Sequence, residues 1–155
     1  MMVAEASILV DATLDHLRQI VLDPQAYAAA DTKVRGITIE ERTADGLVAR
    51  IDGSLGPFRS FIRARYTVAP ERIDLDMLEG RLRHFHALFL LEPGPTAVRL
   101  THREEYDFGY GPLSPLVEWA LRGWAQRSVE AEVLALKRAA EAAAPAPAAP
   151  GPAAG

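Results

Sequence analysis

The stretch Ile62–Met77, IRARYTVAPERIDLDM, decides the fold class, because apolar and charged residues alternate on both sides of a proline. A period of two is typical of a β-strand with one buried side. Ala69-Pro70 lies between the two alternating runs and indicates a tight turn. The sequence therefore predicts an antiparallel hairpin with one charged face and one apolar face.

A two-residue turn at Ala69-Pro70 also predicts which residues face one another. The charged face pairs Arg65 with Asp74 and Arg63 with Asp76. On the apolar face the predicted pairs are Tyr66 with Ile73, Ala64 with Leu75, and Ile62 with Met77. A slip of one residue would mix the two sets, so we expect the charged face outside and the apolar face inside.

Similar alternation continues on both sides of this hairpin and predicts a meander. The expected strands are Val34–Arg42, Leu47–Leu55, Phe58–Val68, Arg72–Leu78, Leu82–Glu92 and Ala97–Phe108, with a further strand at Met2–Val10. Turn residues separate the six strands of the meander, and the connections are too short for parallel crossovers. The sequence therefore predicts seven strands in an antiparallel sheet.

The last hairpin carries the polar residues of greatest interest. A four-residue turn at Pro93–Thr96 would pair Leu91 with Val98, Phe89 with Leu100, Ala87 with His102, and Phe85 with Glu104. The preceding turn, Glu79–Arg81, could supply two or three residues. This leaves open whether Phe85 and Phe89 or His84 and His86 point inward.

Three helices are expected around the sheet. Asp11 is the expected N-cap of a helix over Ala12–Leu22, and Asp23 of a second over Pro24–Ala30. Ser114 is expected to cap a long helix that runs to about Ala143. Its predicted apolar stripe is Leu113, Val117, Ala120, Leu121, Trp124, Ala131 and Leu134, widened by Val129, Val133 and Leu136. Trp119 would then face a sheet edge or a dimer partner.

Composition limits the classes of protein that remain. The chain has 155 residues, a formal net charge of -4 and no cysteine. We expect one domain over residues 1–143 and a disordered tail over residues 144–155, which contain only Ala, Pro and Gly. No apolar run approaches the roughly 20 residues of a membrane span. The mild acidity argues against nucleic acid, and a cytoplasmic location is the default expectation.

The order of elements resembles the START-like (helix-grip, or SRPBCC) superfamily, and within it the polyketide cyclase/dehydrase and lipid-transport group. The matching features are Ile8–Val10 with Asp11-Ala12, Asp23-Pro24 with Tyr27, Phe89 with Leu91 and Pro93, and Val98 with Leu100 and His102. The resemblance implies an α+β helix-grip fold, in which a curved sheet wraps the long helix. It also implies a cavity between them, with the two short helices near its mouth.

His102, Glu104 and Tyr106 share the side of the last strand that is expected to face inward. They could form a polar anchor or an acid/base pair on an apolar wall. The full set of expected ligand contacts is Ile62, Ala64, Tyr66, Ile73, Leu75, Met77, Phe89, Leu100, His102, Glu104, Tyr106 and Trp124. A metal cluster of His84, His86 and His102 has no supporting ligand spacing, so we predict no metal and no cofactor.

Three functions fit this sequence. The first is a carrier or sensor of a hydrophobic ligand such as a lipid, quinone or polyketide. The second is an aromatase/cyclase-type enzyme with His102 and Glu104 as its candidate catalytic groups. The third is a protein–protein module with a vestigial cavity. The expected partner is a hydrophobic small molecule, with no nucleic acid and no membrane span, and the protein is expected to be a monomer or homodimer.

Overall fold

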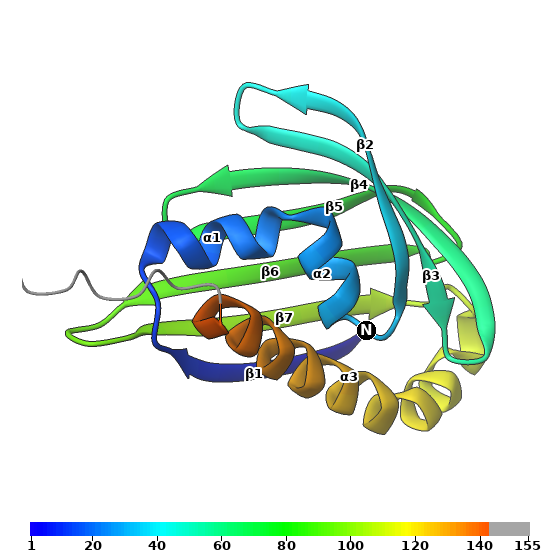
Figure 1. Ribbon diagram of the computed structural model, residues 1–155. Helices are drawn as coiled ribbons and strands as arrows, with labels where there is room; N and C mark the ends of the chain where they lie inside the picture. The colour runs from blue at the N-terminus through cyan, green and yellow to red at the C-terminus, as the bar shows by residue number, and fades with distance from the viewer. Residues whose placement is uncertain (143–155) are drawn as a thin grey trace, which may run out of the picture.

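The computed structural model describes residues 1–142, in which seven antiparallel strands form one curved sheet in the order β1-β7-β6-β5-β4-β3-β2 (Figure 1). The strands are β1 (Met2–Val10), β2 (Val34–Thr43), β3 (Gly46–Leu55), β4 (Phe58–Ala69), β5 (Arg72–Gly80), β6 (His84–Pro93) and β7 (Val98–Asp107). The helices are α1 (Leu14–Leu22), α2 (Pro24–Ala30) and α3 (Ser114–Ala142), with a short 3-10 helix η1 (Gly111–Leu113) before α3. The expected tail lies outside the described residues.

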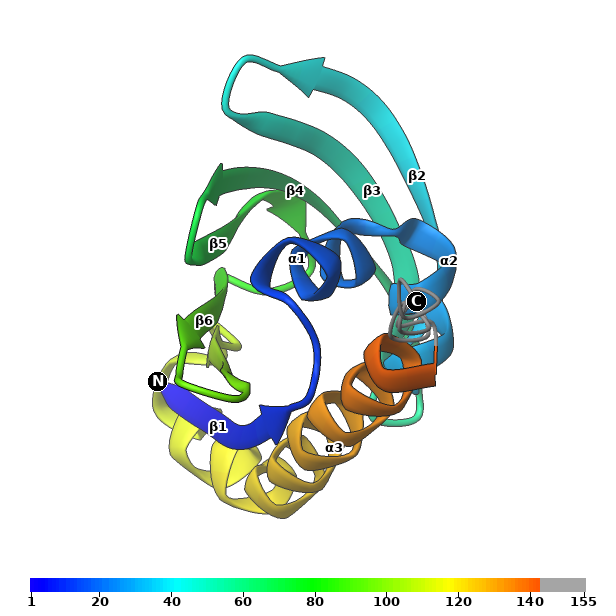
Figure 2. The ribbon, with the colours of Figure 1, turned by 60° about the vertical axis from the view of Figure 1, so that its left-hand side comes forward.

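The sheet curves around α3, as the helix-grip expectation requires (Figure 2). The helix lies along β1 at one edge, and α1 and α2 lie on the same side of the sheet (Figure 1). The core fills the space between these layers, with Phe89, Leu100 and Leu136 fully buried. The fold class and the two short helices after β1 are confirmed.

Side chains of α3 form hydrogen bonds with backbone groups on the free edge of β1, which would otherwise be left unpaired. Gln126 accepts a bond from the Glu5 backbone N–H at 3.3 Å and donates its amide to the Glu5 carbonyl at 2.8 Å. Lys137 donates to the Leu9 carbonyl at 2.8 Å, and Glu141 accepts from the Asp11 N–H at 2.9 Å. Helix and sheet are thus joined by polar contacts as well as by packing.

The hairpin of β4 and β5 has the predicted faces but not the predicted pairs. Ala69 pairs with Arg72, so the turn consists of Pro70 and Glu71 and not of Ala69-Pro70. Moving the turn by one residue moves each partner by two, which preserves the faces. Arg65 therefore faces Asp76 in place of Asp74.

The predicted ion pairs of this hairpin are wrong as a consequence. A bulge after Arg63 brings it opposite Glu79, and its guanidinium donates to Glu40 on β2 at 2.5 Å. Asp74 is instead bound by Arg72 of its own strand at 2.6 Å. The apolar pairs also shift, so that Tyr66 faces Leu75 and Ala64 faces Met77.

The hairpin of β6 and β7 shows the same one-residue difference. Its four-residue turn is residues 94–97, since Pro93 pairs with Val98. Leu91 therefore faces Leu100, Phe89 faces His102, Ala87 faces Glu104, and Phe85 faces Tyr106, which corrects all four predicted pairs. The open question of the faces is settled as well: Phe85 and Phe89 are buried, while His84 is exposed.

The start of α1 differs from the prediction, whereas that of α2 agrees with it. Thr13 caps α1 by accepting a bond from the His16 N–H at 3.2 Å, and Asp11 lies two residues earlier with its own N–H bound by Glu141. Asp23 caps α2 by accepting from the N–H groups of Gln25 and Ala26 at 2.8 and 2.9 Å. Helix α1 therefore begins at Leu14, two residues later than the predicted start at Ala12.

The buried side of α3 lies mostly in its C-terminal half. The fully or almost fully buried residues are Ala125, Ser128, Val129, Glu132, Val133, Leu136 and Ala140. Of the predicted stripe, Leu113, Ala120, Ala131 and Leu134 are exposed, which corrects that part of the prediction, whereas Val129, Val133 and Leu136 are buried as predicted. The helix meets the sheet through its small and branched residues, so the position of the buried side was set by close approach rather than by the largest apolar residues.

Candidate functional site

A cavity lies under the sheet, toward the end formed by β3, β4 and the β5–β6 connection. The cavity has a volume of about 80 Å³, and the empty space around it, including the opening to solvent, is about 570 Å³. It is lined by Tyr27, Asp31, Lys33, Val34, Ile51, Gly53, Ser54, Leu55, Ser60, Phe61, Ile62, Leu75, Leu82, Phe85, Glu104 and Tyr106. Most of this lining is apolar, and its charged groups come from Asp31, Lys33 and Glu104.

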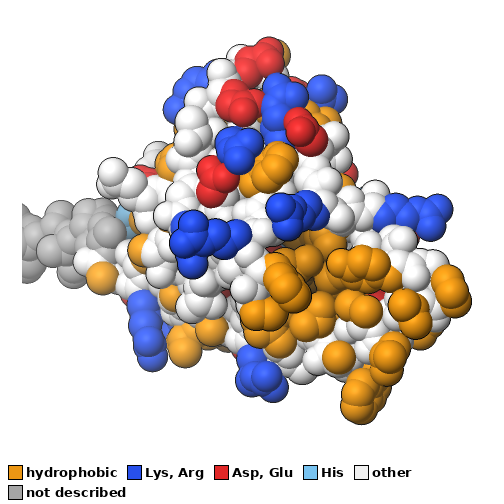
Figure 3. Space-filling view, turned by 90° about the vertical axis from the view of Figure 1, so that its right-hand side faces the viewer, with side chains coloured by type: hydrophobic (Ala, Val, Ile, Leu, Met, Phe, Trp, Pro, Cys, Tyr) orange, Lys and Arg blue, Asp and Glu red, His pale blue; other side chains and the backbone are white. Residues whose placement is uncertain are grey.

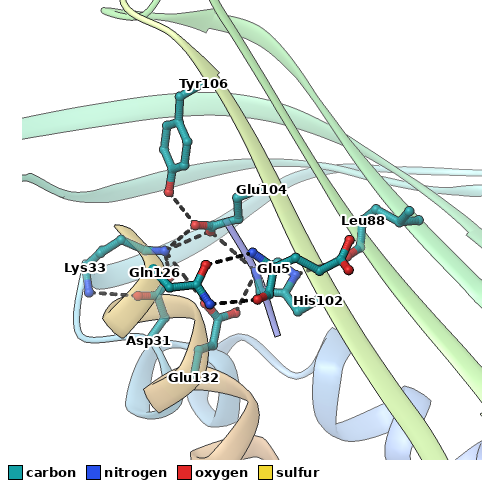
Figure 4. A network of polar contacts seen from close by, with 9 residues as sticks. All are labelled: Glu5, Asp31, Lys33, Leu88, His102, Glu104, Tyr106, Gln126 and Glu132. Carbon is teal, nitrogen blue, oxygen red and sulfur yellow. Dashed lines mark hydrogen bonds and ion pairs between the residues drawn. The ribbon is translucent and has the colours of Figure 1, made fainter. Parts of the chain in front are cut away.

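Lys33 and Glu104 form the centre of the polar part of the wall (Figure 4). The Lys33 ammonium, on the connection between α2 and β2, donates to both carboxylate oxygens of Glu104 at 2.8 and 2.7 Å. The Tyr106 hydroxyl also donates to Glu104. The exposed fractions of the Lys33 and Glu104 side chains are only 11% and 2%, so this pair is shielded from water. Removing either partner would leave an uncompensated buried charge, which is strongly destabilising.

Burial and neighbouring charges set the protonation of this group. Burial alone would raise the pKa of Glu104, but Lys33 and His102 hold that pKa below its ordinary value. Burial would lower the pKa of Lys33, but Glu104 and the other anions raise it well above the ordinary value. Burial and the Glu104 charge together raise the pKa of Tyr106. At neutral pH the wall therefore presents an ammonium, a carboxylate and a neutral phenol.

His102 extends the network toward α3. Its ring stacks on Phe89 with centroids 3.9 Å apart, and its Nδ1–H donates to the Leu88 carbonyl at 3.1 Å. Its Nε2 lies 3.4 Å from a carboxylate oxygen of Glu104 and 3.4 Å from one of Glu132. Burial would lower the pKa of His102, but these two carboxylates raise it to about 10. The ring is therefore a buried imidazolium between two anions.

Asp31 completes the cluster at the end of α2. Its carboxylate lies 3.6 Å from the Lys33 ammonium and accepts the Lys33 backbone N–H at 2.8 Å. Burial and the charge of Glu132 raise the pKa of Asp31 to about 7, despite the opposing effect of Lys33. The carboxylates of Asp31, Glu104 and Glu132 thus surround Lys33, with Glu132 at 3.8 Å.

The same residues include a potential metal-ligand set. His102, Glu104 and Glu132 each have one potential ligand atom, and these three atoms lie within 4.8 Å of one another. His84 and His86 are not part of this group. Imidazole and carboxylate ligands would suit a first-row divalent cation. In the described geometry, however, Lys33 and protonated His102 already supply two positive charges to these carboxylates. These two charges balance Glu104 and Glu132, so a metal would have to displace the His102 proton.

The expected site residues divide into two groups. Ile62, Leu75, Glu104 and Tyr106 line the cavity. The other eight do not appear in the lining, namely Ala64, Tyr66, Ile73, Met77, Phe89, Leu100, His102 and Trp124. Most of them pack in the core between the sheet and the helices, and Trp124 is half-buried. The inward burial of His102 and Glu104 is confirmed, while ligand contact by any of the twelve stays a prediction.

Three charged members of the cluster were not predicted. Lys33 and Asp31 lie in a polar connection that carries no periodic pattern, and Glu132 lies on α3 between Val129 and Val133, which the predicted stripe included without it. A signal for Glu132 was available in the spacing of Val129, Glu132, Val133 and Leu136, which follows one side of a helix. Charge balance was a second signal, since a buried Glu104 needs a cation.

Fold and cavity together define a START-like ligand-binding domain of the helix-grip class. The chain belongs to the family described as polyketide cyclase/dehydrase and lipid transport, whose model matches residues 1–141. No curated protein matches the chain. No described helix has the length and apolar character needed to cross a membrane.

Solved structures with the same fold have low sequence identity to this chain. The protein TTHA0849 from Thermus thermophilus is 14% identical, with a TM-score of 0.81 over 91% of this chain and 98% of that one. A START superfamily protein from Mycobacterium smegmatis is 19% identical, with a TM-score of 0.75 over 92% and 99%. The ZhuI aromatase/cyclase from Streptomyces sp. R1128 is 18% identical, with a TM-score of 0.73 over 90% and 93%. At these identities the likeness shows the fold alone.

Proposed function

We propose that this protein binds a hydrophobic small molecule, such as a lipid, quinone or polyketide-like compound, as a carrier or sensor. The observation that carries the proposal is the cavity near the β3–β4 turn, whose lining is mostly apolar and whose polar part contains Lys33, Glu104 and Tyr106. An apolar body would occupy the space between β3, β4 and α2. A carbonyl or hydroxyl of the ligand would reach the Lys33 ammonium or the Tyr106 hydroxyl.

Native mass spectrometry of freshly purified protein tests this proposal. We expect the protein to carry a co-purified apolar compound that is released by organic solvent. Ser60 is half-buried and lines the cavity, so Ser60→Trp should fill the space and abolish the adduct. The exposed Ser7 on β1 provides the control Ser7→Trp, which should keep it. An adduct that persists in Ser60→Trp would place the ligand elsewhere.

A second candidate function is a polyketide cyclase/dehydrase-like enzyme. The contacts among Lys33, Glu104 and Tyr106 favour it, because a phenol and a carboxylate in a dry pocket can move a proton during enolisation or dehydration. With a synthetic poly-β-keto thioester as substrate, Glu104→Gln and Tyr106→Phe should each cost at least ~100-fold in rate. The exposed Tyr110 gives the control Tyr110→Phe. For a carrier, Glu104→Gln should change ligand affinity. It should also lower stability, because Lys33 and His102 lose the carboxylate that they share.

A further inference from the structure

Five large apolar side chains are exposed at one end of the molecule and form what we call the apolar rim. They are Phe58 (71% exposed), Tyr110 (57%), Leu113 (62%), Leu116 (64%) and Trp119 (75%). Phe58 ends the β3–β4 turn, and the other four lie at or just before the start of α3. Figure 3 shows hydrophobic side chains gathered in one broad area on the side where these segments lie. None of these five side chains contributes to the core.

The rim and the cavity opening lie at the same end of the fold. Phe58 lies between the cavity-lining residues Leu55 and Ser60. A side chain at Gly56 would come within 3.7 Å of Leu121, so the β3–β4 turn lies against the first turns of α3. On the other side, the Arg83 N–H donates to the Asp107 carbonyl at 2.8 Å, which holds the connection containing the cavity residue Leu82 beside the end of β7.

The segments that carry the rim are basic, although the chain as a whole has a net charge of -4. The rim segments, residues 56–61 and 109–122, contain the exposed Arg59 and Arg122 against a single acidic residue, Glu118, and the neighbouring connection at residues 81–83 adds the exposed Arg81 and Arg83. That carboxylate already pairs with the N-terminal ammonium at 3.1 Å. Asp107 lies 3.8 Å from Arg83. The net charge of these segments stays positive even when Asp107 is included. The acidic side chains in Figure 3 gather mainly at its upper end, away from the hydrophobic area.

We propose that the apolar rim docks on the surface of an anionic phospholipid bilayer. Aromatic side chains such as Trp119, Tyr110 and Phe58 favour the boundary between headgroups and acyl chains. Arginines around them pair with anionic headgroups. In this orientation the cavity opens toward the membrane, so a hydrophobic ligand passes between the cavity and the bilayer without crossing water. This transfer of ligand is the only part of the proposal that rests on the proposed ligand-binding function.

Charge distinguishes a bilayer from a second copy of the chain as the occupant of this surface. A two-fold interface places the same patch of both subunits together. The excess of Arg59, Arg81, Arg83 and Arg122 on each copy would then meet an equal excess on the other, with no acidic group of the rim free to pair with them. An anionic bilayer neutralises these arginines, whereas self-association brings like charges together.

Co-sedimentation of the full chain with lipid vesicles tests the docking. We expect binding to phosphatidylcholine vesicles that contain about 30% phosphatidylglycerol, and little binding to phosphatidylcholine alone. Binding should fall steeply from about 0.1 M to about 1 M salt, as the Debye length shortens from ~10 to ~3 Å. The double variant Phe58→Ser, Trp119→Ser should weaken partitioning at least ~10-fold, because partitioning depends on buried apolar area.

Leu9 supplies the matched control, since it is 52% exposed on β1 and lies outside the rim. Leu9→Ser should bind vesicles as the wild-type protein does. Absence of binding to anionic vesicles, or equal binding by the rim variant, would overturn the proposal. So would a dimer in sedimentation velocity that the rim variant abolishes, because the rim would then be an interface between copies. Vesicle binding needs no cavity ligand, so a negative result here is independent of the native mass spectra.

Discussion

At the scale of single residues, the chemistry of this protein depends on a buried group of alternating charges. Lys33 lies among the carboxylates of Asp31, Glu104 and Glu132, and His102 lies between the last two. The desolvation of such groups is costly, so the arrangement is stable only while every charge keeps its partner. The cluster is therefore the place where pH and substitution act most strongly on this fold.

His102 should make the protein less stable as the solution becomes alkaline. Its pKa is about 10 in the folded state against an ordinary value of 6.5, so the folded state holds the proton more tightly than the unfolded chain. The stabilising contribution is therefore complete below the unfolded pKa and is lost as pH rises toward the folded one. Between pH ~8 and ~9 we expect the free energy of unfolding to fall by up to about 1.4 kcal/mol per pH unit.

Urea denaturation across this pH window measures the effect. The part of the window above pH ~8 isolates His102, because Asp31, whose pKa is raised to about 7, has lost its proton by then. The pKa of Lys33 lies above its ordinary value of 10.5, and that of Glu104 is lowered, so neither titrates there. His102→Gln should remove the slope even though it lowers stability, and His84→Gln, at an exposed position, should keep it. A slope that persists in His102→Gln would assign the titration to another group.

Sequence reasoning found half of this cluster for a definite physical reason. His102, Glu104 and Tyr106 lie two apart on one strand, so the period of the strand placed them together on its buried side. Lys33 and Glu132 come from a connection and from a helix, and their approach to Glu104 depends on how three elements pack. Local periodicity contains no information about such packing.

At the scale of elements, the faces of the hairpins could be predicted but their register could not. In both β4–β5 and β6–β7 the turn begins one residue later than the composition of the turn suggested. Ala69 and Pro93 were read as the first residues of the two turns, and β4 and β6 instead continue to them. A one-residue move of the turn preserves the buried side and changes every partner, which is why core burial alone could not reveal the error.

The two sides of α3 should contribute very differently to stability. Leu136 is fully buried among the sheet and the other helices, whereas Leu134, two residues earlier on the same helix, is 38% exposed. Leu136→Ala should lower the free energy of unfolding by about 2–5 kcal/mol, the usual cost of a core truncation. Leu134→Ala should cost less than about 1 kcal/mol, and thermal or urea unfolding of the pair measures both. Equal losses would mean that the buried side of α3 is misplaced.

At the scale of the whole molecule, the curved sheet extends beyond the part of its concave face that α3 and the short helices cover. The buried core includes residues of β1, β3, β4, β5, β6 and β7 and of the C-terminal half of α3, and the cavity lies toward the β3–β4 turn. The resemblance to the helix-grip fold predicted a cavity correctly. It could not predict that Tyr66, Phe89 and Leu100 would be used to pack the core and that Tyr27, Leu82 and Phe85 would line the cavity.

This division between a filled and an unfilled half predicts how a ligand should affect the stability of the fold. A compound that binds only the folded state adds about 2.7 kcal/mol when its free concentration is about 100 times its Kd. For a chain of this length that corresponds to a rise in Tm of very roughly 5–10 °C. Protein denatured, extracted with organic solvent and refolded should therefore melt below the protein as purified, and adding back the extract should restore the Tm. Ser60→Trp occupies the same space with its own side chain, so its Tm should respond to neither treatment. If extraction lowers the Tm of Ser60→Trp as much as that of Ser7→Trp, the stabilising compound binds outside this cavity.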